Sequence, residues 1–345
     1  MVTIPVNNLR SFCENVFIKA GASEEEAKIV VDTLIQANLH GHDSHGALRI
    51  IEYCGNIKKG VFKTHVEPVL VKENTSALVL DGKWGFGQVA VYRGMERVIS
   101  KAKKNYVSIA TVLNCNHCGS LGYYTAMASK ENMIGFALAN SVASVAPYGG
   151  RDRIMGTNAV SISIPAKKHR PFLLDFATSI ASGGTIELAQ MKKEKIPLGW
   201  LLDDEGHPTT NPNDYESLGE VKHGVLLPFG TYKGSAICMA VEAIGGILAQ
   251  GGIRKTTTNN GVFLMAMGID FFRPIEEFEA EMDRLLDLVK GSKKAIGFKE
   301  VLYPGELEYS KEEQRLKGGI PIEEGTWERM VALGRELGVE APRVP

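Results

Sequence analysis

The sequence predicts an α/β protein in which helices from both ends of the chain pack beside a mixed sheet. The chain begins with the spacing of amphipathic helices, and its middle alternates short β-branched runs with helical stretches. Its end is rich in Glu, Lys and Arg and returns to helical spacing. These changes of periodicity divide the chain into a helical unit, residues 1–70 with 307–345, and an α/β unit, residues 71–306.

The first helix signal with a clear start is a capping box. Ser23 and Glu26 have the spacing at which each side chain binds the backbone amide of the other. Apolar residues then recur on one face between residues 27 and 34. This pattern predicts a helix from Glu24 to Leu39.

The remaining elements come from β-branched runs and from the C-terminal tail. Met330, Leu333 and Leu337 predict one more amphipathic helix, which we expect to pack against the N-terminal helices. The predicted strands lie in the runs SALVLDG, YVSIATVLN, IGFALANS, AVSISIPA and GVFLMAMGID.

Composition and charge narrow the class of partner. The 345-residue chain is 44% hydrophobic and 23% charged, which is the balance of a globular protein with a sizeable core. Its formal net charge of -1 gives no basic field to attract nucleic acid, and no apolar run reaches the roughly 20 residues of a membrane span. We therefore expect a small-molecule partner, no nucleic acid and no membrane. Five cysteines and an N-terminus without secretory features predict a reducing, cytoplasmic location.

The stretch GHDSHGALRI gathers two histidines, a serine and an arginine. Ser44 is predicted to cap a helix, which places His45 in the first turn and Arg49 on the same face, with Tyr53 one turn further on. Such an arginine can bind a carboxylate through two hydrogen bonds while the imidazole exchanges a proton with a nearby oxygen. The alternative is that Arg49 is a solvated charge and the histidines are satisfied locally. His42 has no predicted role.

The stretch NCNHCGSLGYY carries another histidine in a turn after a predicted strand. Turns of this kind often hold functional groups in α/β proteins, so His117 is a candidate for chemistry. Cys115 and Cys118 flank it as a CxxC pair. A closed zinc site needs about four ligands, and the sequence has no second motif to supply them. We therefore predict no metal and expect two small buried cysteines.

The stretch GKWGFGQVA resembles a dinucleotide-binding fingerprint. Gly85, Gly87 and Ala90 match the GxGxxA spacing between a predicted strand and a predicted helix. The next strand ends in Asn114, however, and no acidic residue stands where the ribose contact belongs. We reject the fingerprint and interpret the glycines as a tight turn.

Two further stretches combine a charged residue with small or hydroxyl-bearing neighbours. LLDFATSIASGG ends a strand at Asp175, which either contacts a ribose or phosphate region or caps a helix. LPFGTYKGSA places Lys233 before a helix of small residues, where it could meet a phosphate, carry pyridoxal or be solvated. Spacing alone leaves these alternatives open.

Six motifs occur in a fixed order over nearly the whole chain, namely DSHGALR, NCNHCGSLGYY, APYGGRDRIMGTN, LLDFATS, LPFGTYKG and YPGE. As a set they resemble the type 2 malate/L-lactate dehydrogenase family of NAD(P)-dependent oxidoreductases. The resemblance implies a family-specific, non-Rossmann α/β fold. Residues 71–306 would then bind the cofactor and carry catalysis, beside a helical domain built from the two termini. It also implies a homodimer with active sites near the subunit contact.

The resemblance also implies roles for individual residues. His45 and His117 match the two active-site histidines, and Arg49 matches the residue that binds the substrate carboxylate. We assign proton transfer to His117, because His45 beside Arg49 is better placed to orient substrate and nicotinamide. Ser44 and His45 are implied to contact the cofactor, and Ser44 also the substrate. The other implied cofactor contacts are Asp175, Phe176, Ala177, Thr178, Ser179, Ile180, Ala181, Tyr232, Lys233, Pro304, Gly305 and Glu306.

The implied activity is hydride transfer between NAD or NADP and a small 2-hydroxy or 2-oxo acid such as malate, lactate or sulfolactate. Reduction would use a protonated histidine, which we expect to titrate between about pH 6 and 8. The alternative substrate is a cyclic or N-substituted imino acid, which needs the same grip by Arg49. Two other classes stay open, a nucleotide-binding scaffold without turnover and a pyridoxal enzyme that uses Lys233.

Overall fold

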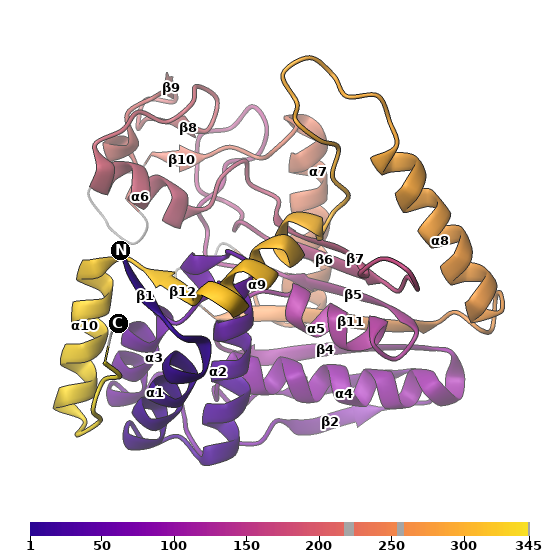
Figure 1. Ribbon diagram of the computed structural model, residues 1–345, viewed down its shortest axis with the longest axis horizontal. Helices are drawn as coiled ribbons and strands as arrows, with labels where there is room; N and C mark the ends of the chain where they lie inside the picture. The colour runs from indigo at the N-terminus through magenta and orange to yellow at the C-terminus, as the bar shows by residue number, and fades with distance from the viewer. Residues whose placement is uncertain (217–223, 254–258, 344–345) are drawn as a thin grey trace.

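The computed structural model describes residues 1–216, 224–253 and 259–343, and its centre is a seven-stranded sheet. The strand order is β2-β3-β4-β11-β5-β6-β7 (Figure 1). Among the described strand pairs of this sheet, β3–β4 alone is parallel. The predicted runs form strands, and the mixed α/β class is confirmed. The strands are β2 (Val69–Glu73), β3 (Ala77–Asp81), β4 (Val107–Cys115), β5 (Met133–Ala139), β6 (Ala159–Ile164), β7 (Phe172–Ala177) and β11 (Asn260–Gly268).

Helices cover both faces of the sheet because the central strands alternate apolar side chains between the two sides. Along β11, Val262 and Leu264 join the core under α4 and α5. Phe263 lies between them in sequence and packs on the opposite face, in the cluster that contains Val241 of α7. The covering helices are α4 (Gly87–Asn105), α5 (Gly122–Ser129), α7 (Tyr232–Val241) and the π-helical η3 (Glu242–Leu248).

A second core is built from the two ends of the chain (Figure 1). The capping box of Ser23 and Glu26 is present at the start of α2, and Met330 of α10 is buried in this core, so both helix predictions are confirmed. Phe86 and Val89, next to and within α4, belong to the same core. The proposed division into two domains therefore stays a prediction. The elements are β1 (Val2–Ile4), α1 (Val6–Lys19), α2 (Glu24–Leu39), β12 (Ile320–Ile322) and α10 (Glu324–Glu336).

A small three-stranded sheet with its own core lies beside the main one. Ile186, Leu201 and Leu226 are fully buried in that core. Its strands have two residues each, too few for a periodic pattern, which is why the sequence did not predict them. The elements are α6 (Gly183–Lys192), β8 (Leu201–Leu202), β9 (Pro208–Thr209), the 3-10 turn η2 (Pro212–Asp214) and β10 (Val225–Leu226).

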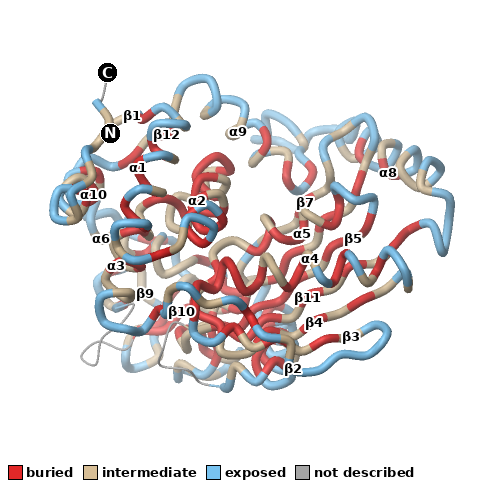
Figure 2. Tube along the Cα trace, turned by 90° about the horizontal axis from the view of Figure 1, so that it is seen from below, coloured by how far each residue is buried: buried red, intermediate tan, exposed pale blue. Residues whose placement is uncertain are grey.

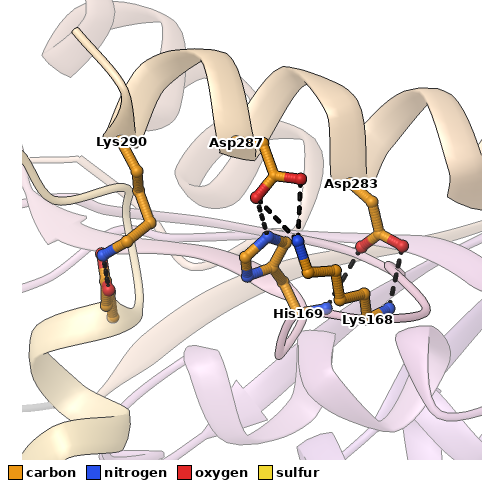
Figure 3. Close-up of polar contacts among 6 residues, drawn as sticks. Lys168, His169, Asp283, Asp287 and Lys290 are labelled. Carbon is orange, nitrogen blue, oxygen red and sulfur yellow. Dashed lines mark hydrogen bonds and ion pairs between the residues drawn. The ribbon is translucent and has the colours of Figure 1, made fainter.

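Helix α8 (Ile275–Lys290) lies at one side of the molecule and is mostly exposed or half-buried (Figures 1 and 2). Polar contacts attach it to the turn that joins β6 and β7 (Figure 3). The Asp287 carboxylate binds Lys168 Nζ at 2.9 Å and His169 Nε2 at 2.8 Å. Asp283 accepts the backbone amides of the same two residues. Met282 and Leu286 of α8 are buried with Tyr303, so an apolar face and these polar contacts together hold the helix in place.

Candidate active site

The DSH residues form a separate 3-10 turn, η1 (Asp43–His45), in front of helix α3 (Arg49–Lys58). The predicted capping role of Ser44 is therefore wrong, because the helix begins beyond Gly46. The reason is a tertiary contact: the side chain of Asn38 occupies the space where a Cβ at Gly46 would lie. The chain bends there before it can continue as a helix.

Helix α9 (Glu306–Gly318) holds this turn in place. Arg315 Nη1 donates to Asp43 Oδ1 at 2.6 Å, and Arg315 Nη2 donates to Oδ2 at 3.0 Å. His42 Nε2 lies 3.8 Å from Glu308 Oε1 on the same helix. The structure thus gives His42 an attachment to α9, where the sequence gave it no role.

The residues with implied catalytic and substrate roles lie together. The ring centroids of His45 and His117 are 5.5 Å apart. Ser44 Oγ lies 3.0 Å from His45 Nδ1, and Arg49 Nε donates to the Ser44 carbonyl at 2.7 Å. Two stretches about 70 residues apart in sequence therefore form one polar cluster.

Burial and a shared positive neighbour keep both imidazoles neutral. Burial, and after it the nearby Arg49 guanidinium, lower the pKa of His45 to about 3. The pKa of His117 falls well below its usual range, mainly through burial and then through Arg49 and His45. Both shifts run against the titration between pH 6 and 8 that we expect from the sequence.

Tyr53 and Gln88 complete the surroundings of His117. Tyr53 Oη lies 2.6 Å from His117 Nδ1, and Gln88 Nε2 donates to the same Oη at 2.9 Å. Both side chains are fully buried. The sequence placed Tyr53 on the helix face of Arg49 without a role, and it gave no signal for Gln88. Their partner is distant in the chain, so local spacing could not reveal the contact.

Gly87, from the rejected fingerprint, packs against the loop that carries His117. A Cβ at Gly87 would overlap the carbonyl oxygen of Asn116 and lie 2.5 Å from that of His117. Gly87 is the first residue of α4, so the helix start packs directly on the His117 backbone. The requirement for glycine is therefore close packing, and the interpretation as a simple tight turn was incomplete.

Arg49 is already paired in this structure. Its Nη1 donates to Glu52 Oε2 at 2.5 Å, one helical turn away on α3. Both side chains are about one-third exposed, so an incoming anion can reach the pair. A substrate carboxylate must therefore compete with Glu52 for part of the guanidinium.

The CxxC pair lies beneath the active-site loop. Cys115 ends β4 and Cys118 follows His117, and both side chains are buried, as expected. Within residues 1–216, 224–253 and 259–343, no group of three or more His, Cys, Asp or Glu side chains is arranged to hold a metal ion. The absence of a metal stays a prediction.

Asp175, near the end of β7, reaches the loop that carries His117. Its buried carboxylate accepts Ser120 Oγ at 2.6 Å and the backbone amide of Gly122 at 2.8 Å. Gly122 is the first residue of α5, so Asp175 caps this helix from a different strand. Burial raises the pKa of Asp175, and these two hydrogen bonds oppose the change. The capping alternative is thus realised, and it connects β7 to the histidine cluster.

The segment after β7 is held by backbone bonds to the LPFGTYKG motif. Phe229 donates its amide to the Thr178 carbonyl at 3.0 Å, and Ile180 donates to the Leu227 carbonyl at 2.9 Å. Ser179 forms a β-bridge with Pro228. Two stretches with implied cofactor contacts are therefore neighbours in space, with Thr178, Ser179 and Ala181 buried and Phe176 and Ile180 partly exposed.

A cavity of about 540 Å³ opens beside these paired segments. Ile180 and Thr231 line one side, and Arg151 lines another together with several glycines. Thr231 directly precedes α7, whose first two residues, Tyr232 and Lys233, are exposed. The start of this helix and the backbone around it can accept a phosphate group.

The YPGE motif runs along β7. Leu173 donates its amide to the Pro304 carbonyl at 3.0 Å. Gly305 has a φ of 98°, and a Cβ there would lie 2.9 Å from that of Leu173, so both conformation and space require glycine. Glu306 pairs with Lys290 of α8 (Figure 3). The three segments with implied cofactor contacts, residues 175–181, the LPFGTYKG motif and the YPGE motif, therefore lie in β7, beside it or beside the segment that follows it.

The whole chain matches known proteins. The model of the malate/L-lactate dehydrogenase family matches residues 4–331. The chain belongs to this family. The malate dehydrogenase of Pyrococcus abyssi is 38% identical, with 99% of this chain and 97% of the relative covered. The L-sulfolactate dehydrogenase of Methanocaldococcus jannaschii is 36% identical, with 98% of each covered. The solved malate dehydrogenase of Entamoeba histolytica has a TM-score of 0.95 at 30% identity, with 99% of each chain covered.

Membership of this family makes the protein a dehydrogenase. The scaffold without turnover and the pyridoxal enzyme, both left open by the sequence, are therefore set aside. In the described part of this dehydrogenase, no helix combines the length and apolar character needed to cross a bilayer.

Proposed function

We propose that this dehydrogenase transfers a hydride between NAD or NADP and a small 2-hydroxy or 2-oxo acid of the malate, lactate or sulfolactate type. The observation that carries the proposal is the cluster of one guanidinium, Arg49, with two neutral imidazoles, His45 and His117. The relatives named malate and sulfolactate dehydrogenase support the substrate class.

Each side chain of the cluster has a task in this proposal. Arg49 binds the substrate carboxylate once Glu52 yields part of the guanidinium. His117 holds a proton at the 2-oxygen of the acid, where charge develops during reduction. His45 and Ser44 orient the acid and the nicotinamide. The helix face of α3 and the loop after β4 fix these groups relative to one another.

The residues beside β7 fit a nicotinamide cofactor. The cavity near Ile180 and Thr231 is lined by five glycines together with larger side chains such as Tyr148 and Arg151. The first turn of α7 leaves backbone amides for a phosphate. We assign the cofactor to residues 175–181, to Tyr232 and Lys233, and to residues 304–306, with Ser44 and His45 at its reactive end. When bound, the nicotinamide gives or accepts the hydride at C2 of the acid.

A substrate panel tests the reaction class. Pyruvate, oxaloacetate, sulfopyruvate and diketogulonate are each assayed with NADH and NADPH, beside a cyclic imino acid. We expect oxaloacetate or sulfopyruvate to exceed the imino acid in kcat/KM by about tenfold or more. Turnover of the imino acid alone would establish the alternative substrate. A folded protein that binds NAD(P)H and reduces none of these compounds would contradict the proposal.

We also propose that the dehydrogenase is a homodimer. Leu288 of α8 is 65% exposed, and Phe298 in the following segment is 70% exposed. A second copy that covers this apolar surface would remove both from water. Light scattering is expected to give twice the 37.5 kDa mass of the chain. A monomer at micromolar concentration would refute the dimer without affecting the reaction class.

A further inference from the structure

Three buried groups form a hydrogen-bonded row that ends at His117. Gln88 Nε2 donates to Tyr53 Oη at 2.9 Å, and that oxygen lies 2.6 Å from His117 Nδ1. The rings of Phe17 and Phe62 pack on Tyr53, with centroids 6.4 and 5.2 Å away. The phenol is therefore enclosed by apolar rings except where it meets these two polar partners.

The row determines where the protons lie. With Gln88 donating to Tyr53 Oη, the phenolic proton is satisfied when it points to His117 Nδ1, and this pairing selects one tautomer of His117. Burial raises the pKa of Tyr53 well above its usual range, so the phenol keeps this proton at neutral pH. Nδ1 of His117 is therefore an acceptor. Neutral His117 carries its own proton on Nε2, the other ring nitrogen.

We propose that Tyr53 supplies, through His117, the proton that reduction delivers to the 2-oxygen of the substrate. The Nε2–H bond of His117 breaks as an O–H bond forms on the substrate. At the same time the Oη–H bond of Tyr53 breaks and an Nδ1–H bond forms. His117 is neutral before and after, and the negative charge moves from the substrate oxygen to Tyr53 Oη. After the product leaves, an O–H bond of water breaks as its proton binds Nε2, hydroxide departs to solvent, and the Nδ1 proton returns to Tyr53 Oη.

The charges around His117 disfavour the simpler route through an imidazolium. Arg49 of α3 and His45 of η1 both lower the pKa of His117, and burial lowers it most. Glu52, the neighbouring carboxylate, is paired with Arg49, and the pKa of His117 is lowered with this pair in place. A protonated His117 is therefore scarce at neutral pH. An aliphatic alkoxide is a stronger base than a phenolate, and Gln88 Nε2 donates to the Oη that becomes negative, so Tyr53 can supply the proton.

The proposal accounts for a buried polar atom of Gln88 that has no hydrogen-bond partner among the described residues. Its Oε1 is buried and has no hydrogen-bond partner in the described part of the chain. A buried oxygen without a partner destabilises the folded protein, so hydrogen bonding within the core does not account for Gln88. Its Nε2 donates to Tyr53 Oη, the atom that becomes negative during the transfer. Tyr53 and Gln88 are thus positioning residues that act through His117.

The first test measures the proton positions directly. The dehydrogenase is labelled with ¹⁵N-histidine, and the signal of His117 is assigned by its loss in His117→Ala. In the wild type at pH 7.5 we expect protonated Nε2 and unprotonated Nδ1. A proton on Nδ1 in the wild type would overturn the inference without any variant of Tyr53.

The second test is the pH profile of kcat/KM for reduction. The inference rests on the proposed function and predicts a flat wild-type profile between pH 7 and 9, since Tyr53 stays protonated. In Tyr53→Phe only an imidazolium can donate, so kcat/KM should fall about tenfold per pH unit. At pH 8 it should be about 100-fold below the wild type. An unchanged profile shape in Tyr53→Phe, or a wild-type profile that already falls tenfold per pH unit, would refute the inference.

Controls separate this inference from loss of packing and from the proposed function. Phe62→Leu alters the packing on the Tyr53 ring without touching the polar row, and should lower the thermal midpoint while leaving the profile flat. Gln88→Met should lower kcat about tenfold, because the charged Oη loses its donor. If His117→Ala is inactive but Tyr53→Phe retains the flat profile, only this inference fails. If His117→Ala keeps full activity, the assigned role of His117 fails as well.

Discussion

The two halves of the active site are built in different ways. The histidine half consists of Ser44, His45, Arg49, Tyr53 and His117, and side-chain hydrogen bonds connect its members. Its polar groups rest on the core formed by both chain ends, to which Tyr53 belongs. Because the contacts join side chains of the protein to one another, packing of the chain fixes the geometry of this half.

The cofactor half, the part to which we assign the cofactor, consists of residues 175–181, Tyr232, Lys233 and 304–306. Backbone bonds attach residues 178–180 to residues 227–229, and Pro304 to β7. The side chains of this half are more exposed: Phe176 and Ile180 are each 40% exposed and Tyr232 is 59% exposed. A bound cofactor would cover much of this apolar surface. The comparison indicates a preorganised group for proton transfer beside an open surface that a large ligand completes. Variants in one half should therefore leave the other intact.

The largest expected effect is that of His117→Ala. We expect kcat to fall about 100-fold or more, because positioned proton transfer is typically worth 10² to 10⁴. The Kd for NAD(P)H should stay within about threefold, since the cofactor half is untouched. Single-turnover rates and fluorescence titration measure the two quantities. If His45→Ala abolishes turnover instead while His117→Ala only weakens binding, the two roles must be exchanged.

The next effect concerns the binding of the substrate carboxylate by Arg49. Arg49→Lys should raise KM for the acid roughly 30-fold, which is about 2 kcal/mol, because lysine cannot replace the forked guanidinium. Glu52→Gln should act in the opposite direction and lower KM a few-fold, because it removes the competing carboxylate. Arg97→Lys, at an exposed position of α4, is the matched control. An unchanged KM in Arg49→Lys would remove Arg49 from the site.

Gly87→Ala should affect the histidine half of the site and leave the cofactor half unchanged. The new methyl group would overlap the carbonyl of Asn116 and press on that of His117, so the loop must move. We expect kcat to fall about tenfold while the Kd for NAD(P)H stays within about threefold. Gly55→Ala in α3 is the control, because its methyl group would meet nothing within 4 Å. Loss of cofactor binding by a folded Gly87→Ala protein would restore the rejected fingerprint.

The sequence predicted what depends on short-range patterns. The capping box placed α2 at its observed bounds, and alternating apolar residues identified β11 and the other long strands. The motifs predicted that His45, Arg49 and His117 act together. The sequence could not predict that α3 begins beyond Gly46. The side chain of Asn38, which lies outside this segment, packs against Gly46, and local spacing does not record such a contact.

The contacts that tune the site were equally hidden from the sequence. Tyr53 and His117 are 64 positions apart, and Gln88 lies in a stretch that spacing assigned to another purpose. The neutral state of His117 depends on burial, which no single motif records. Sequence therefore identifies the residue types of the site, whereas their protonation follows from packing.

Acid should destabilise the protein through three buried histidines, His40 and the two histidines of the active site. Burial lowers the pKa of His40 to about 4 and of His45 to about 3, and lowers that of His117 as well. The unfolded chain binds these protons below about pH 6.5, so stability is lost as pH falls from there towards 4. Each group contributes at most about 1.4 kcal/mol per pH unit. Urea midpoints from pH 7 to 4.5 measure the slope, which should become shallower in His40→Asn but not in His207→Asn, at an exposed turn. Equal slopes in the two variants would contradict this prediction.

The smallest expected effect links α8 to the cofactor half. Lys290 pairs with Glu306, which we assign to cofactor binding, and the pair is partly exposed (Figure 3). Such a pair is worth about 0–1 kcal/mol, so Lys290→Ala should change the Kd for NAD(P)H by no more than about fivefold. Because salt screens exposed charges, the difference from the wild type should shrink at 1 M salt. Lys293→Ala, a few residues beyond at an exposed position, is the control and should behave like the wild type. A change of kcat in Lys290→Ala at unchanged Kd would show that α8 acts on the histidine half, and the separation of the two halves would then be wrong.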